Sequence, residues 1–160
     1  EAQTEICGLL LHSIFTSIDL KNEVSWKEVI EVETCFALFQ CAKLLKYFGF
    51  NSWEEFYIPL NGKNNNVLKQ KTNVLSYYVL KTIILYHLND WFNFQKNNSN
   101  HCFWDMNETD ESIRSWTSLV KNGSEDPIFI RDLNACFQLN DLVSDNKMKI
   151  TCRMTAFELL

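Results

Sequence analysis

The sequence has little glycine and little proline, with only 4 glycines and 2 prolines among 160 residues. Few positions can therefore wrap a backbone loop around a phosphate, and no Walker, G-x-G-x-x-G, G-x-S-x-G or H-E-x-x-H pattern occurs. His87 precedes Asp90 by three residues and could pair with it, but no local pattern supplies a nucleophile. We therefore expect no enzymatic activity, no cofactor and no metal site.

Long uncharged apolar runs are also missing. The most apolar stretch, Val74 to Leu88, is interrupted by Lys81, whereas a membrane-spanning helix needs about 20 apolar residues. Basic residues are not in excess either, since 15 Lys and Arg against 20 Asp and Glu give a formal net charge of −5. We therefore expect no membrane span in this chain and no nucleic-acid partner.

The composition is that of a globular protein, with 46% hydrophobic and 22% charged residues. No internal repeat or Pro- or Ser-rich linker divides the chain, so we expect a single domain over 1–160. Phe, Tyr, Met, Ile, Asn and Lys make up 60 residues, and Gly, Ala, Arg and Pro only 14. This bias fits AT-rich coding, as in many large DNA viruses and parasites.

Six cysteines are spread along the chain without a C-x-x-C pair, which is unlike the close ligand pairs of structural zinc sites. An even number favours three intrachain disulfides; free buried thiols and a metal cluster are the alternatives. Fifteen connectivities are possible. Our first choice is Cys7–Cys41, with Cys136–Cys152 and Cys35–Cys102 for the remaining four.

Three N-x-[S/T] sequons lie close together, at Asn97, Asn107 and Asn122, each in a polar context. Glycans need such solvent-exposed positions. With the even cysteine count, the sequons predict a secreted protein or the extracellular face of a membrane or viral envelope. The first residues carry no basic and apolar signal sequence, so we expect that a signal peptide has already been removed.

Apolar spacing and capping motifs predict about five helices. Apolar residues recur every four positions from Ile6 to Ile18 and indicate an amphipathic helix over 5–20. Ser25 and Glu28 have the spacing of a capping box, which starts the next helix. The other helices are expected over 26–48, 67–94, 109–122 and 127–143, with a short helical turn over 52–59.

A period of two replaces the helical period near the end of the chain. Apolar and polar residues alternate from Met148 to Phe157, which is typical of a half-buried strand. The predicted fold class is therefore mainly α (α+β): an irregular disulfide-linked helical domain of about five helices with a C-terminal β-strand.

Two places could bind a partner protein. Phe103 and Trp104 follow Cys102 in a predicted loop, and exposed aromatic residues are enriched at interfaces. On the predicted strand, Lys149, Thr151 and Arg153 should face outward, so that its free backbone edge could accept a strand from another chain.

These observations predict a non-enzymatic secreted or surface glycoprotein module that binds a partner protein. A receptor-binding or complex-forming subunit of a viral or parasite envelope fits the composition, with a cell-surface receptor or a sister ectodomain subunit as its partner. A soluble helical cytokine-like ligand and a secreted enzyme or enzyme inhibitor are the alternatives.

Overall fold

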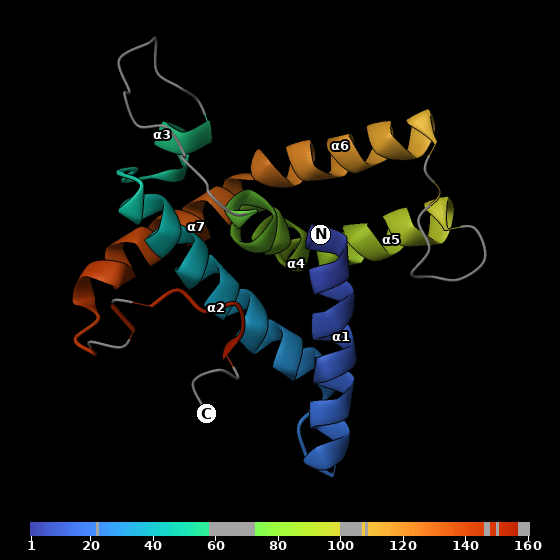
Figure 1. The fold of residues 1–160 in the computed structure, drawn as a ribbon, viewed down its shortest axis with the longest axis horizontal. Helices are drawn as coiled ribbons and strands as arrows, with labels where there is room; N and C mark the ends of the chain where they lie inside the picture. Colours follow the sequence, from blue (N-terminus) through green and yellow to red (C-terminus); the bar gives the residue numbers. More distant parts are fainter. Residues whose placement is uncertain are drawn as a thin grey trace.

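The computed structural model describes residues 1–21, 23–57, 73–99, 107, 109–145, 148–149 and 151–156, and these residues form a helical fold (Figure 1). In chain order its elements are α1 (Ala2–Asp19), α2 (Trp26–Tyr47), α3 (Trp53–Tyr57), the π-helix η1 (Leu75–Leu80), α4 (Lys81–Tyr86), α5 (Leu88–Asn98), α6 (Asp110–Ser124) and α7 (Pro127–Leu142).

Side-chain caps fix where three of these helices begin. The hydroxyl of Ser25 accepts from the amide of Glu28, and the Glu28 carboxylate accepts from the Ser25 amide at 2.7 Å, which completes the predicted capping box of α2. Thr109 caps α6, and Asp126 caps α7 with Pro127 in the first helical position. The predicted starts of these helices are confirmed.

Helix α2 lies at the centre of the fold and packs against α1, α4, η1 and α7. One apolar core joins its second half to α3, η1, α4 and α7 around Trp53 and Phe129. A second core joins its first half to α1, α4 and α5 around Ile6 and Trp91. The indole Nε1 of Trp53 donates to the carbonyl oxygen of Ser124 at 2.8 Å, which ties α3 to the end of α6.

The prediction of a single helix over 67–94 was too simple. Residues 67–72 lie outside the described residues, and the remainder is divided into η1, α4 and α5. The break between α4 and α5 falls at His87, whose φ of −106° and ψ of 40° are not helical. The division, together with the short α3, makes seven α-helices among the described residues instead of about five.

The predicted C-terminal strand is wrong. Met148 and Lys149 are helical, and 151–156 contain no strand. The alternating pattern lacks a neighbouring strand among the described residues. The carbonyl oxygens of Met148 and Thr151 instead accept hydrogen bonds from the Lys43 side chain. A strand needs a neighbouring strand to hydrogen-bond its backbone groups. Here the Lys43 side chain bonds two of these carbonyl oxygens instead.

The predicted disulfide linkage is also wrong: Cys7, Cys35, Cys41, Cys136 and Cys152 are all free thiols, and Cys102 lies outside the described residues. Cys7 packs beside the second core whereas Cys41 lies in the first, so the pair chosen first is divided between two cores. In the second predicted pair, Cys136 is buried and Cys152 is exposed, and both are free.

At Gly123, α6 comes close to side chains at the end of α4. A Cβ atom at this position would lie 2.8 Å from His87 Cδ2 and 2.8 Å from Ile83 Cγ2. Ile83 is buried, and the His87 side chain is only 15% exposed. A larger residue at 123 would therefore force the two helices apart.

We expect Gly123→Ala to lower the free energy of unfolding by about 1–3 kcal/mol, the usual cost of overpacking a core. Gly8→Ala is the matched control, because a Cβ at Gly8 meets no atom within 4 Å. Removing a glycine from an open helical position should stabilise the chain by about 0.4–1 kcal/mol. Urea denaturation should show that the free energy of unfolding falls for Gly123→Ala and rises for Gly8→Ala. The same change in both variants would contradict the close approach at Gly123.

Candidate functional site

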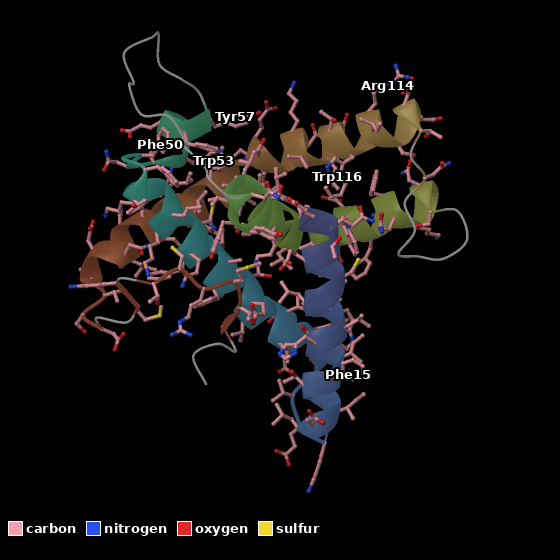
Figure 2. The ribbon with its side chains drawn as sticks, in the orientation of Figure 1. Phe15, Phe50, Trp53, Tyr57, Arg114 and Trp116 are labelled. Carbon is pink, nitrogen blue, oxygen red and sulfur yellow. The ribbon has the colours of Figure 1, made fainter. Side chains whose placement is uncertain are left out.

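The second half of α1 carries large apolar side chains on its outer surface. Leu11, Ile14, Phe15 and Ile18 are all exposed, Phe15 by 61% and Ile18 by 57% of their areas. Figure 2 shows Phe15 pointing away from the rest of the fold. We call these four residues the α1 ridge. Their spacing of i, i+3, i+4 and i+7 places them on one helical face.

The inner surface of the same half-helix carries small hydroxyl residues. Ser13 and Ser17 are buried, and their hydroxyls donate to the carbonyl oxygens of Leu9 and Val24, each at 2.7 Å. Because both hydroxyls are hydrogen-bonded, their burial leaves no unpaired polar group. The polarity of this part of α1 is therefore inverted, with small polar residues inside and large apolar residues outside.

The inversion follows from the geometry of the helix. Residues four positions apart are rotated by about 40° around a helix of 3.6 residues per turn. The apolar series that begins with the buried Ile6 and Leu10 therefore turns outward, so that Ile14 and Ile18 are exposed. The sequence prediction placed all four on one face of an amphipathic helix, but only Ile6 and Leu10 are buried.

A second regularity continues the α1 ridge toward the start of the helix. Gly8, Leu11, Phe15 and Ile18 follow each other at intervals of three, four and three residues, as in the seam of two packed helices. The backbone of this chain needs no glycine at position 8, because a Cβ there would meet nothing. This spacing, together with the serines at 13 and 17, was the signal in the sequence for the ridge.

The sequon asparagines lie on a different part of the fold. Asn97, at the end of α5, and Asn122, near the end of α6, are exposed and line the same cleft of about 710 Å³ between these helices. Asn107 is partly exposed. The hydroxyl residue of the third sequon, Ser124, is buried in the last turn of α6.

The partner-binding residues predicted near the C-terminus lie beside α2 and not on a sheet edge. Lys149 is exposed and lines a cleft of about 600 Å³ that also includes Lys43 and Cys152. Thr151 and Arg153 are partly buried. Phe103 and Trp104 lie outside the described residues.

His87 has a structural place in the fold. Its Nε2 lies 3.2 Å from the carbonyl oxygen of Gly123 and 3.7 Å from Asp126 Oδ2, while Nδ1 lies 3.9 Å from Asp90 Oδ2. The predicted pairing with Asp90 is thus present, and the ring links α4 to α6. In the described part of the chain, no three His, Cys, Asp or Glu side chains are grouped so that they could hold a metal ion.

The buried thiols are poor nucleophiles. Burial raises the pKa of Cys41 to about 12, and burial together with the nearby Cys35 and Asp132 raises that of Cys136 to about 11. The thiolate is the reactive form, so both groups stay protonated at neutral pH. Cys35 and Cys152 are exposed.

No helix within the described ranges is long and apolar enough to cross a membrane. Comparison with protein-family models, with curated proteins and with solved structures finds no match for this chain.

Alkylation with iodoacetamide at pH 8 should distinguish the thiols. Cys35 is expected to react in the native protein, whereas Cys41 and Cys136 should react only after unfolding, because they are buried and protonated. Peptide mapping gives the order of labelling. Recovery of any of these residues in a disulfide from the native protein would contradict the free thiols of the structure.

Because burial raises the pKa values of Cys41 and Cys136, we expect the protein to lose stability at high pH. Free cysteine ionises near pH 9.0, so between pH 9 and 11 the unfolded chain binds fewer protons than the folded chain. The free energy of unfolding should then fall with rising pH, by up to about 1.4 kcal/mol per pH unit for each thiol. Urea denaturation should show a shallower fall for the Cys41→Ala/Cys136→Ala double variant, and an unchanged slope would contradict the prediction.

Proposed function

We propose that this chain is a non-enzymatic protein-binding module of a secreted or surface glycoprotein, and that it docks by inserting the α1 ridge into an apolar groove of another protein. The main support for this proposal is the inverted polarity of α1. Large apolar side chains at i, i+3, i+4 and i+7 are the anchors by which a helix is recognised in a groove. Phe15, the most exposed of the four, is the expected central anchor.

A groove fits this helix better than a flat surface does. His12 and Asp19 flank the ridge and are exposed too, so solvent reaches most of the circumference of the second half of α1. The four ridge side chains alone supply much less than the roughly 800 Å² per partner of a standard interface. A groove that encloses the helix also buries its flanks, whereas a second copy of the ridge would not.

The positions of the sequons support the same docking mode. Asn97 and Asn122 border the cleft between α5 and α6, and Figure 1 shows that the second half of α1 extends away from both helices. Glycans at these positions would leave the ridge open to a protein partner. A cell-surface receptor or a sister ectodomain subunit is the class of partner that we expect.

A photo-crosslinking residue at position 14, beside Phe15, should capture the partner on its native surface. The captured protein is then purified and its affinity measured for single variants of the intact chain. Phe15→Ser should weaken binding by about 30-fold or more, as expected for a central apolar anchor worth about 2 kcal/mol.

Leu142→Ser is the matched control, because Leu142 is a 78% exposed apolar residue at the end of α7. It should leave the affinity unchanged. Equal binding by wild type and Phe15→Ser would refute the docking mode. Crosslinks only between copies of this chain would show that the ridge is a self-association surface instead.

A further inference from the structure

The described residues 148–149 and 151–156, which we call the tail, lie beside α2 (Figure 1). Lys43 donates to the carbonyl oxygens of Met148 and Thr151. Lys81, the first residue of α4, donates to the carbonyl oxygen of Met154 at 2.5 Å. The tail is thus bound through its main chain.

The far end of the tail is bound by a buried carboxylate. Glu33 of α2 is only 1% exposed, and its Oε1 accepts from the Ala156 amide at 3.0 Å and from the Thr155 hydroxyl at 2.5 Å. Lys81 is only 2% exposed. Buried charges need such hydrogen bonds, because an uncompensated charge in the interior is strongly destabilising.

A third polar side chain of α2 remains unused. Gln40 is 1% exposed, and neither its carboxamide oxygen nor its nitrogen has a hydrogen-bond partner among the described residues. Gln40 lies seven residues after Glu33, which is two helical turns along the same face. This face of α2 therefore offers a carboxamide nitrogen and a carboxamide oxygen that the tail does not engage.

We propose that Glu33, Lys43 and Lys81 form a binding site for the main chain of a peptide segment, and that the tail is a replaceable occupant of this site. The site lies apart from the α1 ridge and does not depend on it. Its contacts specify a ligand with three free carbonyl oxygens, followed by a hydroxyl residue and then a small residue with a free amide. A segment of a partner protein with this pattern would use the same groups.

The test weakens the tail in the intact chain and offers the same sequence in trans. Ala156→Pro removes the amide that Glu33 accepts, whereas Ala156→Gly keeps it. A fluorescent peptide with the sequence of residues 148–160 should bind Ala156→Pro at least tenfold more tightly than it binds wild type or Ala156→Gly. In the last two proteins, the attached tail competes at a high effective concentration.

A second pair of variants addresses the hydroxyl contact. Thr155→Val should also admit the peptide, whereas Thr155→Ser should behave as wild type, because serine keeps the hydroxyl that donates to Glu33. Hydrogen exchange over 151–155 should rise only in the two weakened variants.

Equal peptide affinity for all five proteins would overturn the proposal. So would unfolding of both Ala156→Pro and Thr155→Val, detected by circular dichroism, because the tail would then be an integral part of the core.

Discussion

The packing of α1 against α2 determines which side chains of α1 are exposed to solvent. Ser13 and Ser17 turn their small side chains inward along the second half of α1, and each hydroxyl is satisfied by a carbonyl oxygen at 2.7 Å. Because the buried positions are taken by serine, the large apolar residues of this stretch lie outside. The α1 ridge is the direct result, and its exposure is not a failure of packing.

Helix α2 shows a related departure from simple amphipathicity. It buries Glu33 and Gln40 in the same stripe as Ala37 and Leu44, while Val32 is exposed. A carboxylate in this position needs donors, and the tail provides an amide and a hydroxyl. The central helix therefore determines both the path of the tail and the chemistry of the site that the tail occupies.

Helix starts could be predicted from the sequence because their causes are local. The capping box of Ser25 and Glu28 and the cap formed by Asp126 before Pro127 depend on residues within three positions of each other. The strand could not be predicted correctly, because a strand exists only if another segment pairs with it. Alternation after Met148 says nothing about the Lys43 side chain that binds this backbone instead.

The candidate sites depended on side-chain direction, which the sequence fixes less firmly. The residues from Ile6 to Ile18 that are spaced four apart do not share one side of the helix. Each is rotated by about 40° from the one before, so the last two face solvent. Pairing of Cys7 with Cys41 likewise required that two helices run side by side over their whole length, yet the two residues belong to different cores. Glu33 could not be recognised as a buried anchor, because its partners are more than 120 residues away.

We infer that α1 presents its apolar ridge to solvent in the free protein. Fluorine NMR tests it with a fluorinated phenylalanine placed at position 15 and, in a second sample, at position 129, where the native ring is completely buried. We expect a solvent isotope shift at position 15 close to that of the free amino acid, and almost none at position 129. An equally small shift at both positions would contradict it, because Phe15 would then be covered.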